Sequence, residues 1–324
     1  MSQQDFAIGI DIGGGSTKIG LVSASGEIVE HRRVVVTHGS SDDAGAIIAR
    51  YADAISDILA ARPKVKPRGI GIGFPGPIRP DHMSGTLGNI AALDDIPLAA
   101  RIGDLFDLPA RMENDATAAG LAEAMFGHDR DAGRLLVIAA GTGIGVAFTV
   151  DGRPFTTYGG CLGDAGHLIV QGTDGRRCRQ GCTGCLESLA SGDALDGVAQ
   201  RHCTEVPTGP LARRAQALGR PANAGDIIAC AQEGDPAAIA MLAEAGRWLG
   251  RGAATWAHIF APDVILLGGG LGAAGDLLLA PLEQEARSCG LDMYLAPVLF
   301  SLASLGNDAG VIGAAAQIFL TPKP

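Results

Sequence analysis

The sequence predicts an α/β protein with room for two domains, and three observations support this prediction. Apolar strands and helical patterns alternate along the chain. The 324 residues suffice for two domains that share a cleft. Two glycine-rich bends, at residues 13–16 and 141–145, each join a pair of apolar strands. Because the bends occupy comparable places, we expect an internal repeat of one strand meander.

The first meander begins close to the start of the chain. Residues 6–11 alternate as a strand does, and further strands are expected at residues 19–22 and 27–36. The glycines of the first bend join two strands, whereas a Walker loop needs a strand-to-helix transition and a GxxxxGK[ST] spacing. Because glycine has no Cβ, these residues still allow backbone N–H groups to approach a phosphate closely.

The next predicted elements surround an Asn-Asp pair. Apolar spacing predicts a helix that ends at Pro63, and a buried strand is expected at residues 68–74. Residues 88–97 lack periodicity and are expected to form a loop. The pair at residues 114–115 directly precedes an alanine-rich helix at residues 116–126. Such a pair suits a helix N-cap, and a functional role is the alternative.

The second half of the chain repeats the meander and then adds helices. Strands are expected at residues 135–140 and 146–150, followed by a hairpin turn at Asp151-Gly152. Beyond the cysteine-rich segment we expect helices with short links at residues 191–231 and a long helix at residues 237–259. A strand at residues 264–267 is expected to end in three glycines, and an apolar C-terminal helix is expected at residues 310–319.

Composition and charge exclude several classes of protein. A hydrophobic content of 47% with 19% charged residues is typical of a globular protein rather than a disordered one. The net charge of -10 argues against a nucleic-acid-binding surface. The longest uncharged run, residues 135–150, is too short to span a bilayer, and no signal peptide opens the chain. Seven cysteines, three of them clustered, favour a reducing cytoplasm and metal binding.

The segment from residue 163 to residue 187 concentrates groups that bind metals and polar ligands. His167, Cys178, Cys182 and Cys185 form the ligand set of a closed tetrahedral zinc site. Asp164 and Glu187 flank this set and are free for other work. We therefore expect a zinc-stabilised loop that holds polar side chains toward a ligand. A reduced, metal-free cluster is the alternative.

These motifs, in this order and spacing, resemble the ROK family of sugar kinases and sugar-responsive repressors. DIGGGSTK at residues 11–18 and GTGIG at 141–145 resemble the two phosphate motifs of that family. ILLGGG is similar to its adenosine-binding turn, and ENDATAAG to the segment with its catalytic aspartate. GDAGH and CRQGCTGCLE resemble its GExGH and CxCGxxGCxE pair.

The resemblance implies the actin-like, hexokinase-like ATPase fold. In that fold two domains each contain a mixed sheet with flanking helices, and the active site lies in the cleft between them. We expect a smaller domain of residues 1–120, joined by the C-terminal helix at 305–324, and a larger domain of residues 121–304. Such kinases work in the cytoplasm, and family habit indicates a homodimer or homotetramer.

The implied activity is ATP-dependent phosphorylation of a hexose 6-hydroxyl, with glucose or a close relative as acceptor. Asp115 would be the general base, and Asp11 would hold Mg²⁺ through water. The nucleotide would contact Gly13, Gly14, Gly15, Ser16, Lys18, Gly141, Thr142, Gly143, Gly268 and Gly269. The sugar would contact Asn89, Asn114, Asp115, Asp164, His167 and Glu187. For Asn89, a simple turn residue is the competing interpretation.

Three positions depart from the family pattern. Gly15 stands where the first motif usually has threonine, with Ser16 beside it. Asp164 replaces the usual glutamate and is one methylene shorter, so a different or bulkier hexose becomes plausible. Gln180 occupies the middle cysteine position, while an additional Cys182 follows two residues later. We expect Cys182 to supply the missing zinc ligand, since Cys-x3-Cys and Cys-x2-Cys are acceptable spacings.

Three other functions compete with a glucokinase. An N-acetylhexosamine kinase is the nearest, because Asp164 alters the sugar contacts. A ROK-type repressor would carry an additional N-terminal helix-turn-helix domain, whereas the first motif here begins at residue 11. Polyphosphate is a third possibility, as phosphoryl donor, but kinases of that type lack the cysteine cluster. The sequence therefore favours a kinase that uses ATP and binds neither nucleic acid nor membrane.

Overall fold

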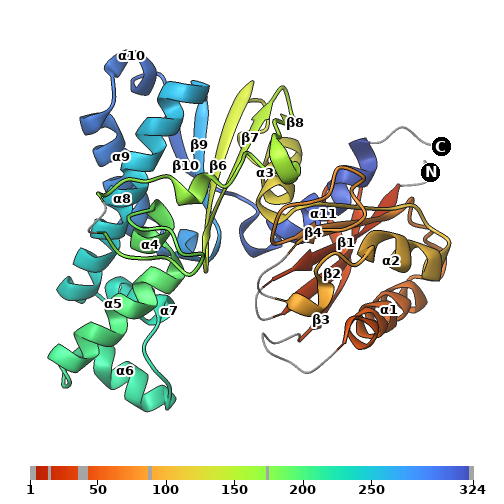
Figure 1. Cartoon of the computed structure of the whole chain (residues 1–324), viewed down its shortest axis with the longest axis horizontal. Helices are drawn as coiled ribbons and strands as arrows, with labels where there is room; N and C mark the ends of the chain where they lie inside the picture. Colours follow the sequence, from red (N-terminus) through yellow and green to blue (C-terminus); the bar gives the residue numbers. More distant parts are fainter. Residues whose placement is uncertain (1–4, 14–15, 36–42, 87–89, 173–174, 321–324) are drawn as a thin grey trace. The chain divides into compact units, whose positions relative to one another are not determined.

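The computed structural model describes residues 5–13, 16–35, 43–86, 90–172 and 175–320 (Figure 1). The chain divides into two compact units. The first comprises residues 1–133, 147–163 and 307–324, and the second comprises residues 134–146 and 164–306. The domain boundaries expected at residues 120 and 304 stay predictions.

The first sheet has the strand order β3-β2-β1-β4-β5. Strand β1 pairs antiparallel with β2, which pairs antiparallel with β3, so the predicted meander is confirmed. Strand β4 runs parallel to both β1 and β5. The bounds of the five strands are Phe6–Ile12, Thr17–Ser23, Ile28–Val34, Ile70–Phe74 and Ala110–Asn114.

Alternation of isoleucine and glycine gives the first sheet two different faces. Ile8, Ile10 and Ile72 belong to a buried cluster with the apolar side chains of α1 (Ala44–Ala61) and α2 (Leu98–Phe106). The alternate positions on β1 and β4 carry glycines that face α11 (Ala309–Leu320), because successive side chains of a strand point to opposite faces. Helix α11 in turn packs on α3 (Asp115–Phe126).

Three adjacent glycines on neighbouring strands let α11 approach this sheet closely. Gly9 lies opposite Gly20 on one side and Gly71 on the other. A Cβ on Gly71 would lie 1.6 Å from the carbonyl oxygen of Ala314, and one on Gly9 would lie 2.0 Å from that of Val311. The sheet therefore has no room for side chains beneath the helix backbone.

We expect Gly71→Ala to destabilise the protein by roughly 3 kcal/mol or more, because its methyl group would force the helix away from the sheet. Unfolding by urea measures the change. Gly73→Ala on the same strand is the matched control, since its Cβ would meet no atom closer than 3.7 Å. Equal stabilities of the two variants would contradict this account of the packing.

The second sheet repeats the topology of the first. Its order is β10-β9-β6-β7-β8, with β9 parallel to both β6 and β10, and β8 antiparallel to β7. Read from β8 to β10, this is the order of β3 to β5, so the predicted internal repeat is confirmed. The bounds of β6 to β10 are Arg134–Ala140, Ile144–Val150, Arg153–Pro154, Val264–Gly268 and Leu299–Leu302.

Helices of the second unit follow the predicted pattern. Within the region expected to be helical, α5, α6 and α7 are joined by short links, and the long helix α8 confirms the prediction for residues 237–259. The bounds of α4 to α10 are Leu186–Ala190, Gly192–Glu205, Pro210–Leu218, Ala224–Gln232, Pro236–Phe260, Asp276–Cys289 and Asp292–Leu295. The 3-10 helices η1 to η5 are Ala91–Leu93, Tyr158–Gly160, Ala165–His167, Gly270–Ala274 and Gly306–Asp308.

The sequence analysis did not predict several short elements that lack capping or stop residues at their ends. Helix α2 has nine residues, and its N-cap residue, Pro97, makes no side-chain cap hydrogen bond, so no local pattern marks its start. The interval expected to be a loop also contains η1. Strand β10 has four residues and an exposed Leu299, which hides the alternation typical of a strand. Among the described helices, none has the length and apolarity needed to cross a membrane.

Candidate active site

Parallel strands of the first unit bring the Asn-Asp pair close to Asp11. Asp11 on β1 lies opposite Gly73 on β4, and Phe74 at the end of β4 lies opposite Asn114 at the end of β5. The carboxyl ends of neighbouring parallel strands meet at one edge of a sheet, which is where ligands bind in α/β proteins. Asp115 follows at once as the first residue of α3.

Asn114, rather than Asp115, caps helix α3. The Asn114 Oδ1 atom accepts a hydrogen bond of 3.1 Å from the Thr117 N–H, and its Nδ2 atom donates one of 3.3 Å to the Gly76 carbonyl. The expected N-cap chemistry is therefore confirmed for Asn114. The Asp115 carboxylate accepts a hydrogen bond of 2.7 Å from the Ala116 N–H. Its other oxygen is not needed for capping.

The electrostatic surroundings of Asp115 hold its proton unusually tightly. Burial, and secondly the negative charge of Asp11, raise the pKa of Asp115 to about 7. The pKa of Asp11 is raised as well by burial, and Lys18 partly offsets this effect. Two carboxyl groups thus repel each other at the edge of the sheet, and a cation bound beside them would relieve the repulsion.

Glu113 is a buried carboxyl group whose importance the sequence analysis missed. Its Oε1 atom accepts a hydrogen bond of 3.1 Å from the Asn114 N–H, and a Cβ on Gly160 would lie 2.5 Å from that oxygen. Burial raises the pKa of Glu113 to about 7. A glutamate at the end of a buried strand was the available signal, because such a residue rarely lacks a specific role.

The bend after β1 is described only in part. Gly14, Gly15 and Asn89, named as candidate ligand-binding residues, lie outside the described residues. The Gly13 N–H donates to the carbonyl of Ser16 at 3.2 Å, and Lys18 donates to the carbonyl of Asn307.

Arg33 is a cation that the sequence analysis did not associate with this bend. Its Nε atom donates a hydrogen bond of 2.9 Å to the Ser16 hydroxyl. Ser16 stands beside the position where the ROK motif usually has threonine. The contact therefore places a guanidinium group next to the hydroxyl that could replace that threonine.

In the second unit, two glycine-rich loops meet at the ends of parallel strands. Ala139 on β6 lies opposite Gly268 on β9, so the loops that follow these strands are neighbours. Gly269 has a φ angle of 77°, and a Cβ on it would lie 2.4 Å from the Ala140 carbonyl oxygen. Only glycine fits this backbone conformation and this close approach. The predicted second phosphate motif and the predicted adenosine turn thus lie side by side.

The loop at residues 141–143 is held by α5 and by Glu187. The N–H groups of Gly192 and Asp193 donate to the carbonyls of Gly141 and Thr142, at 2.7 and 3.2 Å. Its far end is fixed by the Glu187 Oε2 atom, which accepts a hydrogen bond of 3.0 Å from the Ile144 N–H.

Gly143 makes room for that carboxylate. A Cβ on Gly143 would lie 2.4 Å from the Glu187 Oε2 atom, so a larger residue would displace it.

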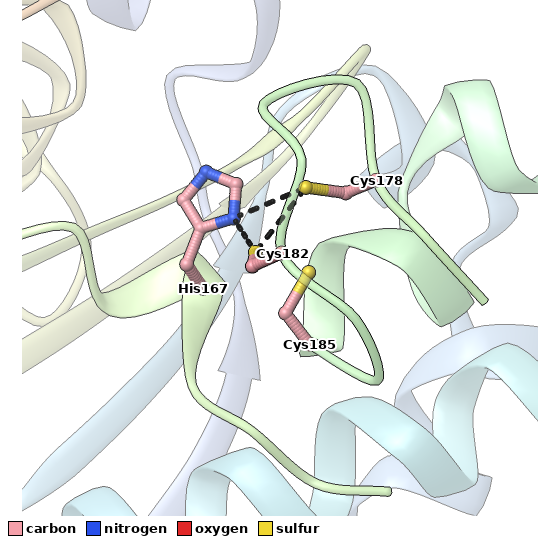
Figure 2. Close-up of side chains that lie close together, drawn as sticks. All are labelled: His167, Cys178, Cys182 and Cys185. Carbon is pink, nitrogen blue, oxygen red and sulfur yellow. Dashed lines mark hydrogen bonds between the residues drawn. The ribbon is translucent and has the colours of Figure 1, made fainter. Parts of the chain in front are cut away.

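The four predicted metal ligands converge in the structure (Figure 2). One ligand atom from each of His167, Cys178, Cys182 and Cys185 lies within 4.8 Å of all the others. The His167 Nδ1 atom lies 3.1 Å from Cys182 Sγ and 3.6 Å from Cys178 Sγ, and the two sulfurs are 3.2 Å apart. Ligand atoms at the corners of a tetrahedron are roughly 3.8 Å apart when metal–sulfur bonds are about 2.3 Å long. This donor set fits a zinc ion, with Cys182 as the third thiol.

Tight turns bring the cysteines together. The Cys178 N–H donates to the Cys182 carbonyl at 2.9 Å, and Ile169 forms a bridge with Cys185. Gly181 and Gly184 have φ angles of 100° and 70°, a conformation that favours glycine. Cys185 itself is fully buried.

His167 connects the cluster to the two acidic residues. While its Nδ1 atom faces the thiols, its Nε2 atom lies 3.5 Å from Asp164 Oδ2 and 3.8 Å from Glu187 Oε1. The side chain of Asp164 is 79% exposed, whereas that of Glu187 is 19% exposed. Both carboxylates therefore lie near the imidazole nitrogen that faces away from the cluster, where they can accept hydrogen bonds from a polyhydroxylated ligand.

Comparisons with known proteins agree with these motifs. The model of the ROK family matches residues 7–319. A glucokinase from Halalkalibacterium halodurans is 33% identical over 311 residues, which cover 94% of this chain and 92% of that protein. A putative xylose repressor from a Caldicellulosiruptor species is 27% identical over 322 residues, which cover 96% of this chain and 77% of the repressor.

A solved structure supports the fold. A ROK family glucokinase from Streptomyces griseus, in complex with glucose and AMPPNP, superposes with a TM-score of 0.82 at 28% identity, covering 96% of this chain and 98% of that chain. The predicted fold class of two mixed sheets with flanking helices, as in the actin-like and hexokinase-like proteins, is confirmed. By its matched residues and its fold, the chain belongs to the ROK family.

Proposed function

We propose that this chain is a sugar kinase that transfers the γ-phosphoryl group of ATP to the 6-hydroxyl of a hexose, with glucose as the first candidate. The observation that carries the proposal is the Asp115 carboxyl group, which lies at the start of α3 beside Asp11 and has a pKa raised to about 7. A general base is most effective when its pKa lies near the pH at which the enzyme works, and a pKa of about 7 suits a cytoplasmic enzyme. Relatives that are glucokinases support glucose as the acceptor.

The proposed reaction needs one proton acceptor. The O–H bond of the sugar hydroxyl breaks and its proton passes to the Asp115 carboxylate, while the sugar oxygen bonds to the γ-phosphorus. The bond from that phosphorus to the bridging oxygen breaks and releases ADP. Bound Mg²⁺ would neutralise phosphate charge, and Asp11 would hold it through water. Lys18 offsets the negative charge of Asp11.

Backbone groups of the glycine-rich loops would hold the nucleotide. We assign the phosphates to residues 13–16, to Lys18 and to residues 141–143, and the adenosine to Gly268 and Gly269. Two observations support these assignments. A Cβ on Gly141 would meet nothing within 4 Å, so the backbone there is open, and the two loops of the second unit contact each other closely. Open glycine backbone allows N–H groups to contact phosphate oxygens.

Hydrogen-bonding side chains would hold the sugar. We assign this role to Asn89, Asn114, Asp164, His167 and Glu187, together with Asp115. Asp164 and Glu187 both face the Nε2 atom of His167, which orders two acceptors around one donor. The shorter reach of Asp164 keeps an N-acetylhexosamine as the alternative acceptor.

Zinc would be held by His167, Cys178, Cys182 and Cys185, and would be structural. Its role would be to fix the ring of His167, so that Nε2 points at the sugar-binding carboxylates. All seven cysteines are free of disulfides, which agrees with a reducing cytoplasm. We further propose a homodimer or homotetramer.

A panel of sugars assayed with Mg-ATP tests the proposed function. We expect turnover with glucose, and lower turnover with mannose and with N-acetylated hexosamines. Replacing ATP by polyphosphate should abolish turnover, because the adenosine turn would then have no ligand. Failure to phosphorylate any hexose with either donor would refute the kinase assignment.

The rate should depend on pH through the protonation of Asp115. Because the pKa of Asp115 is raised to about 7, we expect kcat/KM for the sugar to rise about tenfold per pH unit below 7 and to level off above it. Glu113, whose pKa is also about 7, is the control. The Glu113→Gln variant should keep the same apparent pKa. A flat profile between pH 5 and 8 in the wild type would contradict Asp115 as base.

A further inference from the structure

A cavity of about 190 Å³ in the second unit is lined by arginines. It lies against the cysteine-rich loop and against helices α4 and α5. The charged residues that line it are Arg176, Arg177, Arg179, Arg201, Glu187 and Asp193. Four exposed arginines thus line one cavity together with two acidic residues, although the whole chain has a net charge of -10. None of the described residues proposed for the ATP phosphates lines this cavity.

Both carboxylates of the cavity are already engaged. Asp193 forms an ion pair of 2.6 Å with Arg179. Glu187 accepts a hydrogen bond from the Ile144 N–H and faces His167. Neither carboxylate is therefore available to neutralise the remaining arginines.

Two arginines of the cavity lack a counter-charge within the described part of the chain. No described carboxylate forms an ion pair with Arg176 or Arg201. Both arginines line the same cavity, so two like charges share one space and repel each other. An anion between them would replace this repulsion by two attractions.

We propose that this cavity is a binding site for a phosphate group, carried by inorganic phosphate or by a phosphate monoester. Guanidinium groups bind phosphate oxygens through paired N–H donors, and Arg176 and Arg201 supply two such groups. Arg177, which also lines the cavity, is restrained by a hydrogen bond of 2.9 Å from its Nε atom to the Gly181 carbonyl. Because the Asp193 N–H donates to the Thr142 carbonyl, this cavity adjoins the loop assigned to the ATP phosphates, but residues 141–143 do not line it.

Occupancy of the cavity should also influence the sugar, a consequence that rests on the proposed function. Glu187 lines the cavity and is also assigned to the sugar. A phosphate beside it would change the electrostatic potential at its carboxylate. The affinity for the sugar would then depend on the concentration of phosphate or of phosphorylated sugar.

A simpler role for the arginines is to balance the thiolates of a zinc-loaded cluster. Cys178 also lines the cavity, and three thiolates outweigh the charge of one zinc ion. Under that interpretation, loss of an arginine would weaken zinc binding and no phosphate would bind. The two interpretations differ in a measurable way.

Isothermal titration calorimetry of the zinc-loaded full chain tests the proposal. Inorganic phosphate and glucose 6-phosphate are titrated separately, against chloride at matched ionic strength. We expect saturable binding to the wild type, and binding at least about tenfold weaker to Arg176→Gln and Arg201→Gln, since each loses a charge-assisted contact. Arg247→Gln is the control, because this exposed arginine of α8 pairs with Glu244 of its own helix. The ligand that binds more tightly identifies the source of the phosphate.

Three results would overturn the proposal. Absence of saturable binding to the wild type excludes the site. Equal binding to the wild type and to both variants means that phosphate binds elsewhere, for example at the glycine-rich loops. Loss of zinc from the variants, measured by elemental analysis, assigns the arginines to the cluster. Because binding is measured without turnover, these outcomes are independent of whether the sugar kinase assignment succeeds.

Discussion

Replacing Asp115 by asparagine is expected to lower kcat by about 10² to 10⁴-fold, the contribution typical of a general base. The amide oxygen can still accept the hydrogen bond from the Ala116 N–H, so the start of α3 should remain intact. Sugar affinity, measured by calorimetry, should change little. Asp104→Asn, an exposed change on α2 of the same unit, is the matched control and should keep the wild-type rate. A near-wild-type rate in Asp115→Asn would remove Asp115 as base.

Asp115→Asn should also stabilise the folded protein above neutral pH. The pKa of Asp115 rises from its ordinary value of 3.8 to about 7 on folding, so the folded state holds a proton that the unfolded state has released between these values. Stability is therefore lost as pH rises from about 4 to about 7. The asparagine variant lacks this penalty, so its Tm should exceed that of the wild type at pH 8 and should match it near pH 4.

Removing Cys185 from the cluster is the second change with a large expected effect. This thiol is fully buried and comes from the residue that precedes α4, two residues before Glu187. Cys185→Ser should lower zinc content from about one per chain to nearly none, since a closed zinc site needs its four ligands. Without zinc the ring of His167 would no longer be fixed. We expect kcat/KM for the sugar to fall about 10- to 100-fold, the range typical when ordering around a metal site is lost.

The same substitution elsewhere in the chain separates zinc loss from loss of a thiol. Cys203→Ser on α5 makes an identical chemical change outside the cluster and should keep both zinc and activity. Elemental analysis and the sugar kinase assay measure the two quantities. Full activity of a zinc-free Cys185→Ser protein would show that the cluster does not support the sugar site.

Long, strongly patterned elements were predictable from the sequence. The strands of the repeated meander and the long helix α8 carry hydrophobic periodicities that can be read directly from the sequence. The nine-residue α2 and the four-residue β10 were not predictable, because tertiary packing stabilises such short elements rather than their own propensity. The cap of α3 was predictable, since an Asn hydrogen-bonds its own helix locally.

The sequence by itself determined which chemical groups this protein can use. The cysteine spacing, the glycine-rich bends and the Asn-Asp pair at residues 114–115 are local patterns, and each restricts its own stretch of backbone. Their identity as ROK motifs required no structure.

Only the tertiary structure decided how those groups face one another. It places Nδ1 of His167 toward the thiols and Nε2 toward Glu187, it brings Asp11 near Asp115, and it gathers Arg176 with Arg201 around one cavity. These pairs are separated along the chain, and their distances depend on strand register and loop closure. Because electrostatic interactions depend on distance and burial, the pKa of Asp115 could follow only from the folded chain.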